Sequence, residues 1–172
     1  MKKIRISDRT ILLKSQGNEA TLSFKEKVEI ARLLESAKVQ VVEFPAIENV
    51  KIDTLLLKTI CAFLKNSTMS VCTGMTEEGV TNAWNAISSA SNPRLSVALP
   101  LSPVQMEYVC HKKAPKMLEL ITSLVEKSAS LCKDVEFVAL DATRAEKDFL
   151  FDAINTAINA GAKTITICDD EA

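Results

Sequence analysis

Acidic side chains lie at the carboxyl ends of several segments whose composition predicts β-strands. Four of them are Asp8, Glu43, Asp169 and Asp170. The carboxyl ends of parallel strands meet at one edge of a sheet, where barrel enzymes build their sites, and carboxylate oxygens are preferred ligands of hard divalent cations. This pattern leaves two interpretations open: a site for a cation or a basic partner, and a set of carboxylates that are solvated or paired with basic neighbours.

Three further candidates for chemistry are a glutamate within a strand, two thiols and the single histidine. The two-residue period of a strand puts Glu136 on the face opposite its apolar neighbours, so it either belongs to a pocket or pairs with a lysine. The thiols of Cys72 and Cys168 end predicted strands, but cysteine is also a common buried apolar residue. The single histidine, His111, follows Cys110. Adjacent side chains point apart, so we expect a surface histidine rather than a nucleophile beside its base.

Segments with a strand-like pattern alternate with segments of helical spacing. Two predicted helices begin with capping-box sequences, Ser23–Glu26 and Thr143–Glu146, in which the first residue caps the helix and the glutamate reaches back. Gly161 ends the last helix. Strands are predicted at 4–6, 39–44, 69–72, 95–99, 135–139 and 164–168, and helices at 23–34, 53–64, 76–91, 115–132 and 143–161.

This alternation predicts βαβ units and a parallel sheet. Successive predicted strands start about 32 residues apart, and a (β/α)8 barrel of about 250 residues has roughly 31 residues per unit. We therefore expect an α/β fold, a partial (β/α)8 TIM barrel with six βα units, formed by residues 1–172 as a single incomplete domain. The alternative is a doubly wound parallel sheet, which the lack of a glycine-rich phosphate loop after the first strand disfavours.

The composition excludes several classes of protein. The 21 basic and 22 acidic residues balance, which argues against electrostatic capture of nucleic acid or of an anionic membrane. The 47% hydrophobic content argues against disorder. The chain has no run of 18 apolar residues, the length that would be needed to span a bilayer. Five cysteines without CxxC spacing predict neither a disulfide scaffold nor a zinc knuckle. The first residues lack the features of a signal peptide, so we expect a cytoplasmic protein.

Several stretches of the chain together resemble one enzyme family. The most specific are Asp134–Phe137 and Asp141–Arg144, and the similarity continues through Ile6–Ile11, Ser102–Tyr108 and Ala157–Asp169. These stretches resemble the 2-isopropylmalate, homocitrate and citramalate synthases, which are metal-dependent aldolase-like enzymes. The resemblance implies a TIM barrel and a Claisen condensation of an acyl-CoA with a 2-oxo acid. A divalent metal would polarise the oxo acid, and an arginine would stabilise the developing oxyanion.

The chain departs from the family's pattern where that chemistry resides. By the resemblance, Leu12 stands in place of the catalytic arginine and Leu13 in place of a metal-binding aspartate. The family's serine and glutamate on the fifth strand become Val138 and Leu140, and its histidine after the fourth strand becomes Gln105. Alkyl groups offer no lone pair to Mg²⁺, Mn²⁺ or Zn²⁺. The family's His-x-His metal ligands lie on a seventh strand, which this chain does not reach.

The sequence therefore predicts a relative that has lost the metal site and the catalytic arginine and needs no cofactor. It would act as a non-catalytic binding or assembly module, or be a fragment of a longer protein; the alternative is an active acyltransferase or lyase with an altered site. Expected partners are a second copy or the missing C-terminal part of the barrel, and a small 2-oxo acid or acyl-CoA. The ligand-binding candidates are Asp8, Gln16, Glu43, Gln105, Glu136, Asp169 and Asp170.

Overall fold

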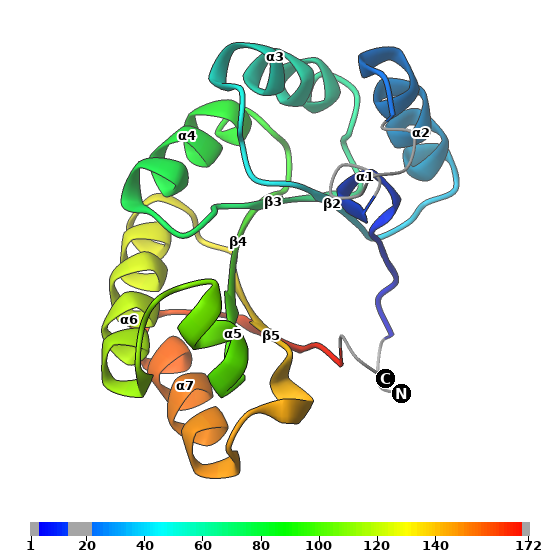
Figure 1. Cartoon of the computed structure of the whole chain (residues 1–172). Coiled ribbons are helices and arrows are strands. Elements are labelled where there is room, and N and C mark those ends of the chain that lie inside the picture. Colours follow the sequence, from blue (N-terminus) through cyan, green and yellow to red (C-terminus); the bar gives the residue numbers. More distant parts are fainter. Residues whose placement is uncertain (1–3, 14–21, 170–172) are drawn as a thin grey trace. The chain divides into compact units, whose positions relative to one another are not determined.

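Strands and helices alternate in the computed structural model, which describes residues 4–13 and 22–169 (Figure 1). The strands are β1 Ser7–Asp8, β2 Val41–Phe44, β3 Thr68–Cys72, β4 Pro93–Pro100, β5 Val135–Leu140 and β6 Thr164–Ile167. The helices are α1 Thr10–Leu13, α2 Phe24–Ser36, α3 Val50–Cys61, α4 Glu77–Ile87, α5 Pro103–Tyr108, α6 Ala114–Leu131 and α7 Lys147–Ala160, with a 3-10 turn, η1, at Ala142–Arg144.

The pairs β1–β2, β2–β3, β4–β5 and β5–β6 are parallel, and the strand order follows the chain from β1 to β6. In a doubly wound sheet the order would reverse at a switch point. The expected fold class is therefore confirmed: the chain is an α/β protein whose six parallel strands and intervening helices match a partial TIM barrel. It divides into two compact units, Met1–Cys72 with Thr81–Arg94, and Thr73–Val80 with Leu95–Ala172. That residues 1–172 form one domain stays a prediction.

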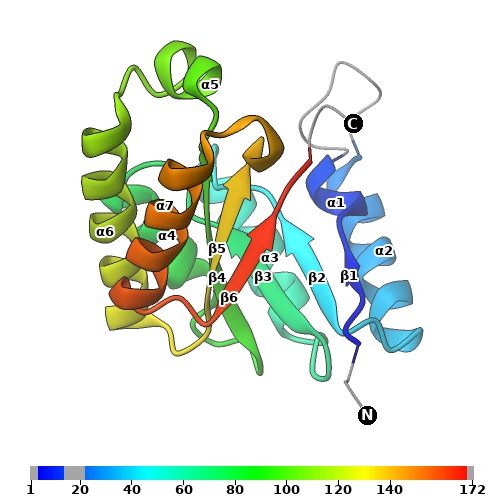
Figure 2. The same ribbon diagram turned by 90° about the horizontal axis from the view of Figure 1, so that it is seen from below.

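The first unit has β2 between β1 and β3, as Figure 2 shows. The alternating apolar residues of β2 and β3 form its core, with Val42, Phe44 and Val71 at most 1% exposed. Helix α2 begins at the capping box that the sequence predicts. The Ser23 hydroxyl accepts a hydrogen bond from the Glu26 amide, and the Glu26 carboxylate accepts one from the Ser23 amide at 2.7 Å.

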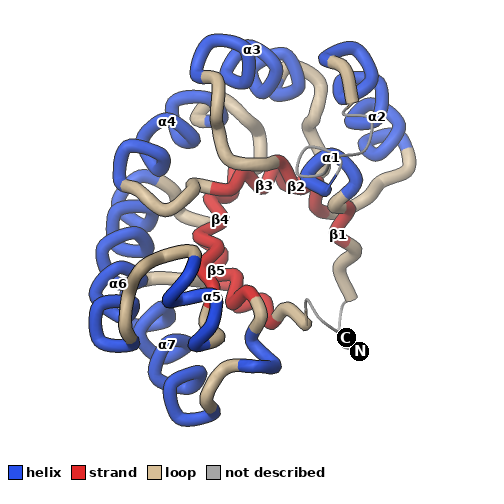
Figure 3. Tube along the Cα trace, in the orientation of Figure 1, coloured by secondary structure: helices blue, strands red, loops and turns tan. Residues whose placement is uncertain are grey.

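The second unit has β5 between β4 and β6. Helices α6 and α7 contact each other and pack on β5, as the tube in Figure 3 shows. The apolar stripe of α6 is fully buried at Met117 and Ile121. Pro115 lies in the first turn of α6, as predicted. Gly161 caps α7 with φ +118°, a left-handed conformation that favours glycine.

Two local predictions are wrong. Thr143–Glu146 is not a capping box, because the Thr143 hydroxyl donates to Asp169 Oδ1 at 2.6 Å instead. Glu146 is the N-cap of α7 and makes no side-chain cap bond. The first strand is Ser7–Asp8 rather than residues 4–6. The sequence also did not predict the short elements α1, α5 and η1, which all follow carboxyl ends of strands.

Among the described residues, no helix has the length and apolar character to cross a membrane.

Candidate functional site

The carboxylate of Glu43, at the end of β2, is held by residues next to it on β1 and the turn that follows. Ser7 Oγ donates to Glu43 Oε1 at 2.6 Å. Arg9 Nε lies 3.1 Å from Glu43 Oε2 in an ion pair, although its N–H is not aligned for a hydrogen bond. The Glu43 side chain is 19% exposed. The Glu43 carboxylate thus has its charge partner inside the first unit, and little of its side chain is exposed to solvent.

Asp8 is occupied in the same way. Its Oδ1 accepts the Thr10 amide at 3.0 Å, and its Oδ2 accepts the Thr10 hydroxyl at 3.3 Å. This Asx-type turn starts α1, because the carboxylate satisfies a backbone donor that has no partner in a first helical turn. Asp8 and Glu43 are therefore brought to the ends of neighbouring strands, as predicted, but each has a structural partner there.

Helix α1 places the two leucines of the altered motif. Leu12 is buried, with 8% of its surface exposed, whereas Leu13 is 55% exposed. Neither side chain can coordinate a cation or donate to an oxyanion. Leu12 instead contributes its alkyl group to the core of the first unit beside the fully buried Ile11. The donor set at these two positions does not fit the divalent metal that the resemblance implies.

The second unit carries its own carboxylates at the ends of β5 and β6. Glu136 on β5 is 7% exposed and accepts a hydrogen bond from Thr166 Oγ1 on β6 at 2.6 Å. Beside it on β5, Val138 is 8% exposed and Leu140 is half-buried. Glu136 therefore does not extend into a row of polar groups along its strand. Its polar neighbours lie on the adjacent strands instead: Ser96 is its register partner on β4, and Thr166 on β6 is the hydroxyl donor.

Asp141 and Arg144 form an ion pair in the second unit. Arg144 Nε and Nη2 donate to the two oxygens of Asp141 at 2.7 and 2.6 Å, and the Asp141 side chain is fully buried. The Arg144 hydrogen bond, aided by one from Ser102, lowers the pKa of Asp141 against the opposing effect of burial. Asp141 has φ +51°, a region that aspartate tolerates better than most residues. The pair fixes the turn from β5 into η1.

The remaining sequence-predicted residues are dispersed. Gln105 is half-buried in α5, and Asp169 accepts the Thr143 hydroxyl. Gln16 and Asp170 lie outside the described residues. Within residues 4–13 and 22–169, no three His, Cys, Asp or Glu side chains are grouped so that they could hold a metal ion. Cys168 is 7% exposed and Cys72 is half-buried.

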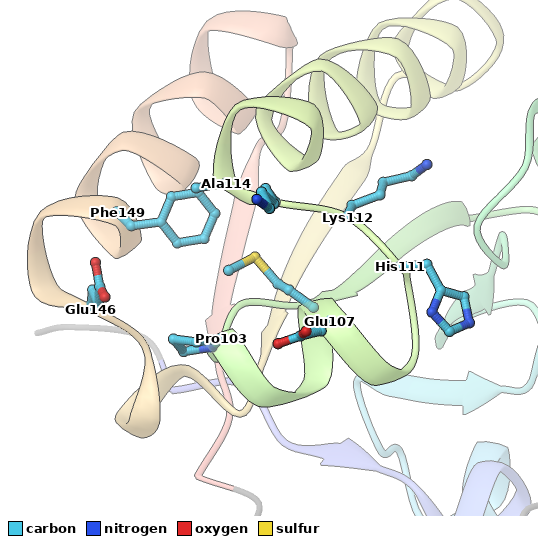
Figure 4. Close-up of a pocket in the computed structure, with 9 residues that line it drawn as sticks. Pro103, Glu107, His111, Lys112, Ala114, Glu146 and Phe149 are labelled. Carbon is cyan, nitrogen blue, oxygen red and sulfur yellow. The ribbon is translucent and has the colours of Figure 1, made fainter.

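A cavity that the sequence did not predict lies in the second unit beside α5 (Figure 4). Its volume is about 500 Å³, within the usual range for small-molecule sites. Residues of α5, of the loop from α5 to α6 and of the start of α7 line it. They include Met106, Glu107, His111, Lys112, Glu146 and Phe149. The only sequence signal for it was Ser102-Pro103, a helix start that the strand–helix period did not require.

Comparison with known proteins places these features in a family. The HMGL-like family model matches residues 3–170. The chain is 32% identical to the probable 2-isopropylmalate synthase of Glycine max over 96% of its length and 31% of the relative's. It is 35% identical to the 2-isopropylmalate synthase of Nitratidesulfovibrio vulgaris over 97% of its length and 32% of the relative's. The chain thus spans about a third of the length of these curated relatives.

Proposed function

We propose a function from one premise, that the chain belongs to the HMGL-like family. The function is that of a non-catalytic family member, a binding and assembly module for a small 2-oxo acid or acyl-CoA. One observation carries it. Leu12 and Leu13 occupy the positions that resemble the family's arginine and metal-binding aspartate, they are the last two residues of α1, and the Leu12 side chain is packed into the core.

Acyl transfer to a 2-oxo acid needs a group that polarises the carbonyl and a cation at the developing oxyanion. The nearby cation in the altered motif is Arg9, whose guanidinium lies against Glu43. Recruiting Arg9 would leave that carboxylate without its charge partner, and freeing Asp8 for a metal would remove the start of α1. The polar residues present therefore support the local structure of the first unit rather than a reaction at its strand ends.

The second unit supports the same proposal. On β5, Val138 and Leu140 put alkyl groups where the resemblance implies a serine and a glutamate. Asp141 and Arg144, which the chain keeps, are paired with each other. A binding role needs only a shaped surface and satisfied scaffold contacts, both of which the second unit retains.

The decisive experiment measures CoA release from acetyl-CoA with a panel of 2-oxo acids, followed chromatographically because the five thiols would react with a thiol dye. The Nitratidesulfovibrio vulgaris relative, assayed in parallel with Mg²⁺ and Mn²⁺, is the positive control. We expect no turnover by the chain above the protein-free background. Turnover that disappears on Asp8→Ala would overturn the proposal and favour the alternative, an active acyltransferase or lyase with an altered site.

Metal independence is tested separately by thermal unfolding. A ligand that binds only the folded state raises the midpoint, so Mg²⁺ or Mn²⁺ should leave it unchanged. An increase that Asp8→Ala or Glu43→Gln removes would show that these carboxylates hold a metal. Thermal unfolding with 2-oxo acids or acetyl-CoA as ligand tests the binding role, and the absence of any increase with either class would contradict it.

Self-association is the assembly that we propose. β1 pairs with β2 alone among the described strands, and the residues that lead into it, Ile4 and Ile6, are 84% and 62% exposed. An open parallel edge beside exposed apolar residues favours association. Light scattering after size exclusion should give about 38 kDa, twice the 18.8 kDa chain mass. A strictly monomeric chain would instead favour a further segment of a longer protein as the partner.

We also propose a cytoplasmic location, because the five cysteines are free and thiols stay reduced in that compartment.

A further inference from the structure

The cavity beside α5 has an apolar floor. Met106 of α5 and Phe149 of α7 form it and are 6% and 9% exposed. These side chains come from helices that follow different strands, so the hollow is a feature of the packed second unit rather than of one helix. A volume of about 500 Å³ above an apolar floor is typical of a site for a small molecule.

Charged side chains of both signs surround this floor without pairing. Glu107, Lys112 and Glu146 make no side-chain hydrogen bond or ion pair with any described residue. Elsewhere in the second unit such groups do pair: Lys116 Nζ lies 2.7 Å from Glu119 Oε2, only a few residues along α6. The cavity charges are thus opposite in sign, border the same hollow and do not satisfy one another. They are available to a ligand.

The charges are separated along the cavity. Figure 4 shows the carboxylates of Glu107 and Glu146 on the side of Pro103 and the Phe149 ring, and His111 and Lys112 at the other end. An ammonium group is attracted both to carboxylates and to an aromatic ring. A carboxylate or another anion would be attracted to the lysine at the opposite end.

The loop that carries the basic end is held in shape. His111 has φ +51°, a conformation that residues with side chains rarely adopt. The Lys112 amide donates to the Met106 carbonyl at 3.0 Å, which closes the loop back onto α5. The basic side chains are therefore presented by a fixed backbone, which lowers the entropy cost of binding.

We propose that this cavity binds a small amphoteric compound with an apolar body, whose protonated amine lies by Glu107 and Glu146 and whose anionic group lies by Lys112. The site does not depend on the proposed non-catalytic function. A failure of one would leave the other standing, because the carboxylates and leucines at the strand ends take no part in the cavity.

The test uses a matched series of linear compounds and isothermal titration of the full chain. The ω-amino acids from 4-aminobutanoate to 8-aminooctanoate carry both charges, hexylamine carries only the amine, and hexanoate carries only the carboxylate. At least one ω-amino acid should bind about tenfold more tightly than both single-ended compounds, because each end adds a charge-assisted hydrogen bond. Amide chemical shifts should change at 103–114 and 146–149 and not at the ends of β1 and β2.

Single substitutions at each end identify the site. Glu146→Gln and Lys112→Met should each weaken the best ω-amino acid about tenfold. The controls are Glu126→Gln and Lys133→Met, at exposed residues of the second unit that do not line the cavity. They should leave binding unchanged. Glu146 and Lys112 make no side-chain bonds within residues 4–13 and 22–169, so their variants should fold normally, which circular dichroism checks.

Each other outcome overturns the proposal. Equal binding of hexylamine and the ω-amino acids would mean a site for cations alone, and equal binding of hexanoate would mean a site for anions alone. No binding by any compound up to about 10 mM, equivalent to less than about 3 kcal/mol, would mean that the cavity is not a site for this class. Equal losses in the control variants would mean non-specific charge attraction.

Discussion

Glu43 and Glu146 are both glutamates at the carboxyl side of a strand, yet they differ in every contact. Glu43 is 19% exposed, with Ser7 and Arg9 against its two oxygens. Glu146 is exposed, makes no side-chain bond with the part of the chain that the structure describes, and borders the cavity beside α5. The described carboxylates at the strand ends of both units, to which the family resemblance points, have partners from this chain. The carboxylates around the unpredicted cavity, Glu107 and Glu146, have none among the described residues.

This difference separates residues that hold the structure from residues that are free to bind. A buried carboxylate with internal donors stabilises the fold and is costly to disturb, because its removal leaves those donors unsatisfied. An exposed carboxylate without partners contributes little to stability. The comparison therefore predicts opposite results for substitutions that are chemically alike.

The largest effect is expected at Asp141. Asp141→Ala leaves the Arg144 guanidinium without its two hydrogen bonds and puts alanine at φ +51°. The free energy of unfolding should fall by about 3 kcal/mol, the lower end for a broken buried pair because Arg144 is partly exposed. Urea denaturation measures it, with Glu119→Ala as the exposed-pair control. A loss no larger than that of the control would show that the buried pair does not stabilise the turn.

Glu35 should show the next largest effect. Burial opposes its ionisation, but hydrogen bonds from the Asn66, Ser67 and Lys65 amides outweigh it and lower the pKa of Glu35 to about 2. Because the folded pKa lies below the unfolded value, this stabilisation is complete above about pH 4.5 and is lost as the pH falls toward 2. After allowance for partial exposure, it amounts to about 2 kcal/mol.

The variant Glu35→Gln tests this assignment by denaturation at several pH values. It should be destabilised at pH 7, and its stability should fall less than that of the unmodified chain between pH 4.5 and 2.5. Glu29→Gln, at an exposed position of the same helix, is the control and should keep the original pH dependence. Parallel curves for Glu35→Gln and the unmodified chain would exclude Glu35 as the source.

A smaller effect is expected at Thr166. Thr166→Val keeps the shape of the side chain but removes the donor to the buried Glu136. The unfolding free energy should fall by about 1 to 2 kcal/mol, because a buried acceptor loses a hydrogen bond. Thr164→Val on the same strand is the control, since its hydroxyl has no side-chain bond in the described structure. Equal changes at both threonines would assign the loss to β6 packing.

The smallest effect is expected at the cavity. Glu146→Gln and Glu107→Gln should each change the unfolding free energy by less than about 0.5 kcal/mol, as exposed substitutions without partners do. The same urea experiment measures them. A loss comparable to that at Asp141 would contradict the division into structural and available carboxylates and would assign the cavity rim a structural role.

Local patterns predicted local elements. The Ser23–Glu26 capping box, the proline at the start of α6 and the left-handed Gly161 each act within a few residues, so the chain itself specifies them. The βα period of the chain predicted six parallel strands for the same reason, since each unit repeats one local alternation.

Contacts between distant residues decided the rest. Thr143 has a partner 26 residues away, and Glu136 has one 30 residues away, so neither could be assigned from the neighbouring sequence. The prediction of a second capping box was wrong because the Thr143 hydroxyl donates to Asp169 instead of capping the helix. The cavity was missed because its floor joins α5 to α7, elements far apart along the chain.

The sequence by itself indicated the family and the alternation of strands and helices, and it established that Leu12, Leu13, Val138 and Leu140 carry no metal-ligating group. Residue type fixes whether a group can hold a metal, wherever it lies. Only the tertiary structure decided which of the remaining charged groups are already satisfied. Satisfaction is a matter of distance between atoms, and packing brings together donors and acceptors that the order of residues keeps apart.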